Sequence, residues 1–363
     1  MNQVPKSIML TPGPTPLPPS VYEKMAEPIL HHRTQEFGRL FSGVLSALKS
    51  VFRTKNSVLM VTCSGTGSME SAVANLLSPG DLSLVHSTGA FGDRFLHIHK
   101  AYGLDPAFLS EEWGRAADGD KLRAALRSRT GVKAVFLQHT DTSTGVVNDL
   151  RALAAIIREE SDALVVVDSI SGLGAEELET DAWGLDIVLS ASQKGLMAPP
   201  GLAYMAVSER AWKACEAAKL PRFYFDWRAM RKSLPNLETP FTPAVGLVAA
   251  QAEALRLILA EGMEGVWRRT AELAAFTRAE VQKLGLRLFA RDAADILTAA
   301  WLPEGMDGKK LLKEILEEDR ISIAGGQEKL AGRIVRIAHM GHIRKPDVEA
   351  GLRALARRLK APA

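Results

Sequence analysis

The sequence contains only two cysteines, Cys63 and Cys215, among its 363 residues. Two cysteines cannot form the disulfide framework of a small secreted fold, and their wide separation does not match a zinc-binding motif. We therefore expect a chain that binds no metal ion and works in a reducing compartment, the cytoplasm.

Long apolar runs and an excess of one charge are absent as well. No run approaches the ~18 apolar residues of a membrane-spanning helix, and the N-terminus lacks the apolar segment of a secretory signal. Lysine and arginine together number 45, and aspartate and glutamate 42, with both signs dispersed along the chain. The composition therefore predicts that the chain binds neither a membrane nor nucleic acid.

What the sequence does contain is an alternation of short apolar runs with amphipathic helices. Runs such as SVLMV, LVVVD and DIVLS are rich in β-branched residues, which is typical of parallel strands covered on both faces. The pattern then changes to that of a smaller α+β region. We expect a proline-rich N-terminal arm at residues 1–20, a large α/β domain at residues 21–260 and a small domain at residues 261–363.

The last third of the chain begins with a long predicted helix, TPAVGLVAAQAEALRLILAEG. Thr242 is a suitable N-cap for it and Pro243 a suitable first helical residue. Further on, RIVRIA predicts a strand that places Arg336 inside an apolar stretch. A buried guanidinium needs a partner, either a carboxylate of the protein or the carboxylate of a ligand.

The segment SGTGS, residues 64–68, lies between a predicted strand and a predicted helix. Its glycines, Gly65 and Gly67, permit close backbone approach, and the free N–H groups at a helix N-terminus attract an anion such as phosphate. The segment lacks the lysine of a nucleotide-binding P-loop. Taken alone, the segment is more typical of an ordinary turn capped by a serine or threonine.

Two further side chains fall at the ends of predicted strands. Asp168 ends the run LVVVD, where a carboxylate serves as a helix cap, joins an ion pair or binds a cationic ligand. Lys194 follows DIVLSASQ and precedes a turn rich in glycine and proline. It is either a lysine that reaches solvent or a partly dehydrated amine nucleophile.

An anion loop, a carboxylate and an amine at one sheet edge match the needs of pyridoxal 5′-phosphate. This cofactor requires a phosphate cradle, an acid against its pyridinium nitrogen and a lysine for its aldehyde. The three features together therefore predict a pyridoxal-phosphate site at the carboxyl edge of the sheet.

Ordered motifs along the whole chain resemble the class V, fold-type I aminotransferases of the alanine–glyoxylate and serine–pyruvate (serine–glyoxylate) type. The matching segments, in chain order, are TPGPTPLPPSV, HHRTQEF, SGTGSME, TGAFGDRF, DTSTG, VVVDSISGLG, SASQKGLMAPPG, FTPAVGL and RIVRIAHMG. The resemblance implies an α/β fold, in which a large domain with a mostly parallel seven-stranded sheet covered by helices is joined to a smaller α+β domain. It also implies a homodimer with composite active sites.

The resemblance implies roles for individual residues. Lys194 would hold the cofactor through a Schiff base and act as the catalytic base, and Asp168 would pair with the pyridine nitrogen. Arg336 would bind the substrate carboxylate, with Gly13 beside it. The other implied cofactor contacts are Gly65, Thr66, Gly67 and Gln193 at the phosphate, Phe91, Thr142 and Ile170 at the ring, and Thr239 and Thr242 at the phosphate of the neighbouring subunit.

The resemblance further implies ping-pong transfer of the amino group of a small amino acid, alanine or serine, to glyoxylate or pyruvate. Phe91 stands where many relatives have tryptophan, and Thr140 and Asp141 stand where asparagine and glutamate are common. Three alternatives stay open: a lyase or desulfurase, a transaminase for amines without an α-carboxylate, and a non-catalytic cofactor-binding subunit. Cys63 and Cys215 are expected to be structural, which argues against a desulfurase.

Overall fold

The computed structural model describes residues 7–359, and its largest element is a seven-stranded sheet. In spatial order the strands are β2 (Ser57–Val61), β10 (Ala203–Val207), β9 (Ile187–Ala191), β8 (Leu164–Asp168), β5 (Ala134–Gln138), β3 (Ser83–Ser87) and β4 (Ala107–Ser110). Strand β10 is antiparallel to both of its neighbours, and all other pairs are parallel. The predicted mostly parallel seven-stranded sheet is therefore confirmed.

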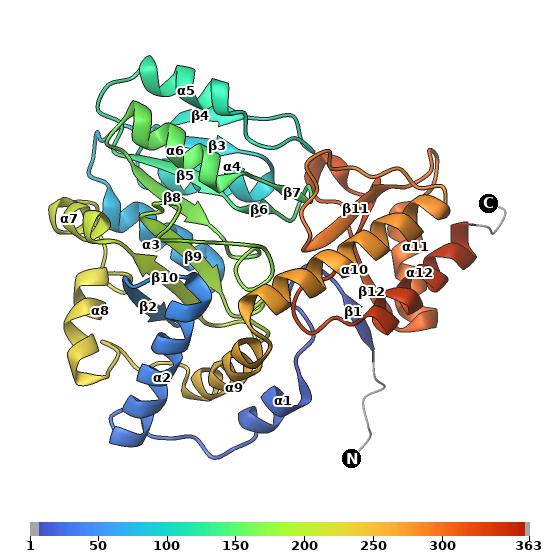
Figure 1. The fold of residues 1–363 in the computed structure, drawn as a ribbon, viewed down its shortest axis with the longest axis horizontal. Coiled ribbons are helices and arrows are strands. Elements are labelled where there is room, and N and C mark those ends of the chain that lie inside the picture. Colours follow the sequence, from blue (N-terminus) through green and yellow to red (C-terminus); the bar gives the residue numbers. More distant parts are fainter. Residues whose placement is uncertain (1–6, 360–363) are drawn as a thin grey trace.

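Helices cover both faces of this sheet (Figure 1). Along β8, Val165 and Val167 enter one apolar cluster and Leu164 and Val166 enter the other, because successive side chains point to opposite faces. One face carries α1 (Pro19–Met25), α2 (Gln35–Phe52), α5 (Gly119–Arg127), α6 (Leu150–Glu160) and α9 (Val245–Glu261), and the other α3 (Gly65–Leu76), α4 (Ala90–Ala101), α7 (Glu209–Ala217) and α8 (Trp227–Ser233). This double covering explains why the strands read as continuous apolar runs.

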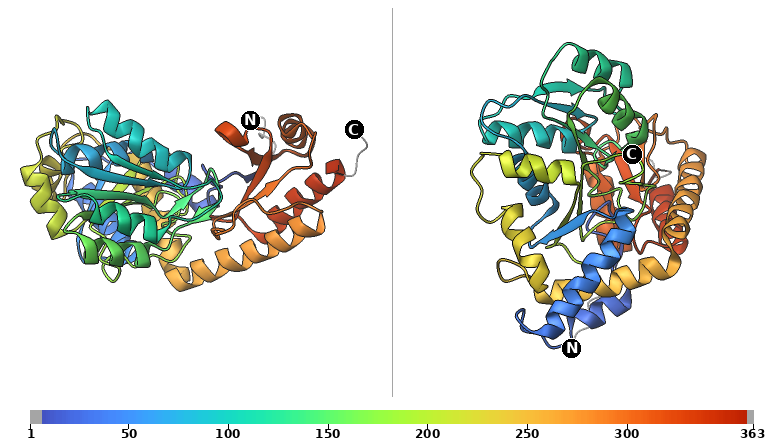
Figure 2. Two further views of the ribbon diagram at one scale, coloured as in Figure 1. Left: turned by 90° about the horizontal axis from the view of Figure 1, so that it is seen from above. Right: turned by 60° about the vertical axis from the view of Figure 1, so that its left-hand side comes forward.

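A second sheet of four strands has the order β1 (Ile8–Leu10), β12 (Ile321–Gly325), β13 (Ile334–Ala338) and β11 (Leu297–Trp301). Its apolar cluster is shared with α10 (Met263–Lys283), α11 (Gly308–Asp319) and α12 (Lys345–Leu359). Helix α10 contacts both α9 and β11, so it runs from the large sheet to the small one (Figure 2). Strand β1 comes from the N-terminal segment and pairs in parallel with β12, a pairing that the sequence did not predict.

The predicted start of α9 is wrong. The helix begins at Val245 with Ala244 as its N-cap, instead of at Pro243 with Thr242 as its N-cap. The amide of Ala244 donates to Thr62 Oγ1 at 3.1 Å, which holds the preceding chain against the end of β2.

The sheet register brings the predicted site segments to one edge. Val61 of β2 pairs with Ala203, which also pairs with Ala191 of β9, and Asp168 of β8 pairs with Leu189. Strands β2, β8 and β9 therefore end on the same side of the sheet, followed by residues 64–68, by Ser169 and by the Lys194 turn. The predicted common edge is confirmed.

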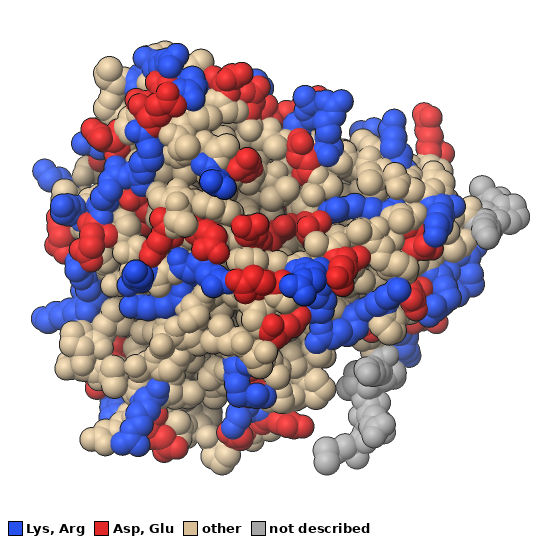
Figure 3. All heavy atoms as spheres, viewed as in Figure 1, with Lys and Arg blue, Asp and Glu red and all other residues tan. Residues whose placement is uncertain are grey.

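No helix among residues 7–359 combines the length and the apolar character needed to cross a membrane. On the face shown in Figure 3, basic and acidic side chains are intermixed over the large and small parts of the chain. A short hairpin of β6 (Thr140–Asp141) and β7 (Val146–Val147) completes the strands that position the site.

Candidate active site

Asp168, the last residue of β8, is a buried carboxyl without a cationic partner. Its side chain is 4% exposed, and its Oδ1 accepts a hydrogen bond of 2.9 Å from the Ile170 amide. Within residues 7–359 it forms no ion pair, so the ion-pair interpretation is wrong. Burial raises the pKa of the Asp168 carboxyl to about 7, against the opposing charges of Arg94 and Lys194. Such a group suits the N–H of a protonated pyridine ring.

Lys194 lies in the turn after β9, where the N-terminal segment packs against it. Its Nζ donates to the Pro12 carbonyl, and Thr15 Oγ1 donates to the Lys194 carbonyl at 2.9 Å. Gly13 has a φ of +131°, which favours glycine, and a Cβ there would lie 2.2 Å from Nζ and displace the Lys194 side chain. Burial lowers the pKa of the Lys194 amine to about 8, with Asp168 opposing the shift. A neutral, nucleophilic amine is thus accessible near neutral pH.

Residues 64–68 form the start of α3, and no side chain caps this helix. The turn capped by a serine or threonine is therefore excluded, and the first helical amides stay available to an anion. A Cβ on Gly65 would lie 2.7 Å from Ile170 Cδ1, and a Cβ on Gly67 would lie 2.8 Å from Cys63 Sγ. Both glycines are needed to keep the loop close to its neighbours.

Phe91 is held at the start of α4 by a carboxylate from the β6–β7 hairpin. Oδ2 of Asp141 accepts hydrogen bonds from the amides of Phe91 (3.0 Å) and Gly92 (3.2 Å). Oδ1 accepts from the amide and the hydroxyl of Ser143. Burial raises the pKa of the fully buried Asp141 carboxyl, and these donors oppose the shift. The hairpin therefore fixes the backbone that presents the Phe91 ring.

Among residues 7–359, the guanidinium of Arg336 on β13 hydrogen-bonds only to carbonyl groups. Its Nε donates to the Gly325 carbonyl at 2.7 Å and its Nη1 to the Thr142 carbonyl at 2.6 Å. The side chain is 5% exposed and forms no ion pair within the described chain, so the alternative of a partner carboxylate in the protein is wrong. Burial lowers the pKa of the Arg336 guanidinium to about 10, with Asp141 opposing the shift. The buried cation is suited to a ligand carboxylate.

Gln193 and Thr142 also lie at this site. The Gln193 carbonyl accepts the Thr15 amide at 3.0 Å, while its side-chain Oε1 is buried without a hydrogen-bond partner. Thr142 is buried and joins the site through its carbonyl contact with Arg336. A buried side-chain oxygen that lacks a partner beside Lys194 is typical of a residue that bonds a ligand.

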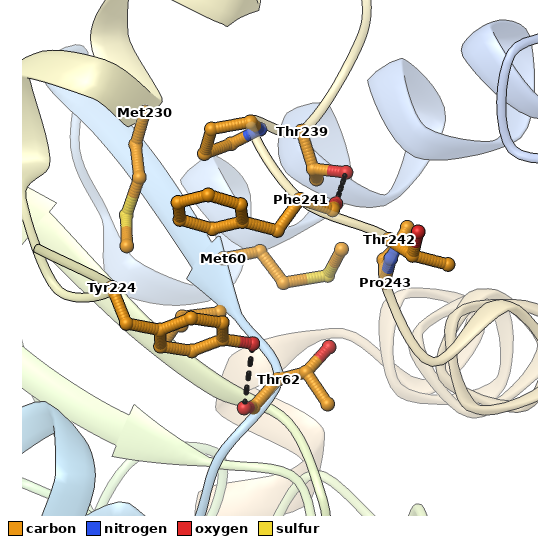
Figure 4. Close-up of a pocket in the computed structure, with 10 residues that line it drawn as sticks. Met60, Thr62, Tyr224, Met230, Thr239, Phe241, Thr242 and Pro243 are labelled. Carbon is orange, nitrogen blue, oxygen red and sulfur yellow. Dashed lines mark hydrogen bonds between the residues drawn. The ribbon is translucent and has the colours of Figure 1, made fainter.

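Thr239 and Thr242 have no hydrogen bond to the residues around Lys194 in the part of the chain that the structure describes. They line a small cavity with Met60, Tyr224 and Phe241 (Figure 4). Thr239 Oγ1 donates to the Phe241 carbonyl at 2.7 Å. Thr242 is exposed, with its Oγ1 at 3.5 Å from His32 Nε2. Their contact with a neighbouring subunit's phosphate stays a prediction.

The sequence motifs assigned no role in the site to Arg94 and Asp141, yet both lie there. Arg94 follows Phe91 by one helical turn, and this spacing could have indicated that both share a face of α4. Its guanidinium carbon lies 4.7 Å from the Phe91 ring centroid, and its Nη1 donates to Thr66 Oγ1 at 3.0 Å. Asp141 stood out only as a departure from the family pattern, because its bonds to α4 are made in the tertiary structure.

The residues present fit pyridoxal phosphate. Among the described residues, an uncapped helix N-terminus, a buried carboxyl without an ion pair, a dehydrated amine and an unpartnered glutamine side-chain oxygen lie at one sheet edge. They match the phosphate, the pyridine nitrogen and the aldehyde of that cofactor. Between residues 7 and 359, no group of three or more His, Cys, Asp or Glu side chains is arranged to hold a metal ion.

Comparison with known proteins agrees with this geometry. The family model for class-V aminotransferases matches residues 9–345. The soluble hydrogenase 42 kDa subunit of Anabaena cylindrica is 40% identical over 94% of this chain and 90% of its own length. The L-aspartate–glyoxylate aminotransferase of Paracoccus denitrificans is 35% identical over 92% of this chain and 86% of its own. The solved alanine–glyoxylate aminotransferase from Nostoc sp. has a TM-score of 0.94 and 32% identity, covering 99% of this chain and 96% of that one. The chain therefore belongs to the class-V aminotransferase family.

Proposed function

We propose that this chain is a pyridoxal-phosphate-dependent transaminase that moves the amino group of a small amino acid, alanine or serine, to a small 2-oxo acid. The observation that carries the proposal is the grouping of Asp168, Arg336 and Lys194, three ionisable side chains that are largely removed from water. Asp168 and Arg336 are buried without ion pairs, and both act on the pKa of the partly dehydrated Lys194 amine. These groups match the ring nitrogen, the α-carboxylate and the amino group of the reactants.

The side chains divide the chemistry among them. Pyridoxal phosphate, when bound, supplies a carbonyl group that carries the amino group and a protonated ring that withdraws electrons from the substrate Cα. Asp168 holds the proton on the ring nitrogen, since a buried carboxylate favours a cation beside it. Arg336 binds the α-carboxylate and so fixes the position of Cα. Lys194 accepts the Cα proton as a general base and returns it as an acid, in a ping-pong cycle.

The choice of substrates rests on two observations. The aminotransferases from Paracoccus and Nostoc share glyoxylate in their names and differ in the amino donor, so glyoxylate is the proposed acceptor. Pro12 and Gly13 pack against Nζ of Lys194, so the N-terminal segment lies beside the proposed reactive amine. This close packing supports the proposal of a donor with a small side chain.

The alternatives are less well supported. A desulfurase needs a reactive thiolate, but burial raises the pKa of the Cys63 thiol to about 12 and that of the Cys215 thiol to about 11. An amine without a carboxylate would leave the Arg336 charge without a partner. The hydrogenase subunit named above keeps open a role as a subunit without turnover. The presence of Lys194, Asp168 and Arg336 favours a working transaminase.

The proposed function is tested by single-turnover reactions of wild type and Arg336→Ala with alanine, serine, aspartate and an amine without a carboxylate. Loss of a charged hydrogen bond is worth about 1.5–3 kcal/mol, so Arg336→Ala should raise the half-saturating concentration of amino acids about ten- to a hundredfold. Arg336→Lys should recover part of the loss, because lysine lacks the planar fork. The neighbouring Arg333, which stacks on Trp301 at 5.1 Å, provides the matched control Arg333→Ala.

An unchanged half-saturation in Arg336→Ala would remove Arg336 from the substrate site. Equal turnover of the amine and the amino acids by wild type would favour the amine transaminase. No turnover of any donor by protein that has bound the cofactor would favour the non-catalytic subunit.

We also propose that the chain works in the cytoplasm, since both of its cysteines are free, and that it acts as a homodimer with composite sites. Phe223 is 80% exposed, Tyr224 is 39% exposed, and both rings contact Phe241 beside Thr239. Exposed aromatic clusters of this kind favour burial by a partner. A second copy would bring Thr239 and Thr242 to the neighbouring phosphate.

Phe223→Glu should therefore shift a wild-type dimer toward monomer and weaken cofactor retention, because a charge would enter the apolar interface. Sedimentation and cofactor release measure the two effects. Leu316→Glu is the matched control, since Leu316 is 47% exposed on α11, away from this cluster. A fully active wild-type monomer at assay concentration would contradict the proposed dimer.

A further inference from the structure

The predicted phosphate cradle carries no cation of its own. Residues 64–68 include neither lysine nor arginine. The N-terminus of α3 offers only about half a positive charge. A phosphate monoester carries about −1.5 to −2 charges at neutral pH. Because a partly buried anion needs compensation, a second source of positive charge is expected at this end of the site.

Arg94 is in contact with the cradle. Its Nη1 donates to Thr66 Oγ1 at 3.0 Å, and its guanidinium carbon lies 4.7 Å from the Phe91 ring centroid. Within residues 7–359 it forms no ion pair with an aspartate or glutamate. Its charge also reaches the reactive end of the site, since it opposes the burial that raises the pKa of Asp168. Arg94 thus keeps an uncompensated charge between α3 and α4.

Other guanidinium groups near these elements are already hydrogen-bonded to backbone carbonyl groups. Arg222, beside the far end of α3, donates to the carbonyls of Ala74, Cys215, Ala218 and Leu220. Arg336 is tied to Gly325 and Thr142 at the opposite end of the site. Arg94 is the guanidinium that contacts the phosphate loop, and Thr66 Oγ1 is its only hydrogen-bond partner in the described chain.

We propose that Arg94 neutralises the cofactor phosphate and makes this site selective for the phosphorylated cofactor over the same compound without its phosphate. The inference rests on the proposed function, because it requires pyridoxal phosphate at this site. Stacking on Phe91 orients the planar guanidinium, and its remaining N–H groups match phosphate oxygens. The cation that the SGTGS loop lacks is supplied by α4.

The test compares two ligands that differ only in the phosphate. Both lack the aldehyde, so neither forms a covalent bond with Lys194. Cofactor-free protein is titrated with pyridoxamine 5′-phosphate and with pyridoxamine, and binding is followed by protein fluorescence. Arg94→Gln should raise the dissociation constant of the phosphorylated ligand about ten- to a hundredfold and should not weaken the binding of pyridoxamine. Arg94→Met, which keeps an apolar contact with Phe91, should behave alike and serves if the glutamine variant does not fold.

Arg231→Gln is the matched control, because Arg231 stacks on Trp212 at 4.5 Å outside the site. It should bind both ligands like wild type. Equal weakening of both ligands in the Arg94 variants, or no weakening, overturns the proposal. If wild type binds neither ligand, the proposed function fails, whatever Arg94 does. The ³¹P resonance of the bound ligand gives an independent readout, since loss of Arg94 should let the phosphate protonate at higher pH.

Discussion

Replacing Lys194 by alanine is expected to lower amino transfer by about 10²- to 10⁴-fold, because the reaction loses its general acid–base group. The variant should still bind the cofactor through the phosphate cradle and Asp168, but it should lose the covalent link that borohydride reduction traps. Single-turnover kinetics and the mass of the reduced protein measure the two effects. An added small amine, which restores a base, should recover part of the rate.

The exposed Lys313 provides the matched control, since its side chain is 72% exposed on α11. Lys313→Ala should keep both the covalent link and the rate. If Lys194→Ala retained the link, another lysine would have to hold the cofactor, and the assignment of the site to the β9 edge would be wrong.

Asp168→Asn is expected to slow the half-reaction by about ten- to a hundredfold, because an amide cannot keep the ring nitrogen protonated and a charged hydrogen bond is worth about 1.5–3 kcal/mol. The asparagine keeps an oxygen for the Ile170 amide, so the fold should be retained. Rates of amino transfer with alanine measure the loss. A fall of less than about tenfold, roughly 1.4 kcal/mol of barrier, would mean that Asp168 is not the ring partner.

The same substitution should stabilise the cofactor-free protein in a pH-dependent way. The pKa of Asp168 is about 7 in the folded chain and about 4 when the chain is unfolded. Its buried charge therefore costs stability that is fully felt above pH ~7 and disappears below pH ~4. The rise in melting temperature caused by Asp168→Asn should be larger at pH 8 than at pH 5.

Asp186 gives the matched contrast, because it is buried yet paired with Arg158 (2.6 Å) and Arg210 (3.2 Å). Asp186→Asn should lower the melting temperature at pH 8, since it leaves two guanidinium groups without their partner. It should not change the half-reaction. If both substitutions raised the melting temperature, burial of the carboxylate would determine the change in stability, whether or not the carboxylate is paired.

Some features of the site could be predicted from the sequence pattern, and others needed the structure. Apolar periodicity placed Asp168 and Lys194 at strand ends because side-chain alternation and strand length are local properties of the chain. Parallel strands then bring their carboxyl ends together, so the shared edge also followed from the sequence. The start of α9 did not, because the Ala244 amide donates a hydrogen bond to the Thr62 hydroxyl, which lies far away in the chain.

The sequence by itself therefore determined the doubly covered sheet, the edge that carries the site and the residue types at strand ends. The tertiary structure alone decided which charges are left without partners: Arg336 meets carbonyl groups and no carboxylate, and Arg94 reaches the phosphate loop from a different helix. It also paired β1 with β12 and placed Pro12 and Gly13 against Lys194. Each of these contacts joins segments distant in the chain. Their free energies depend on burial and geometry that no local window of sequence contains.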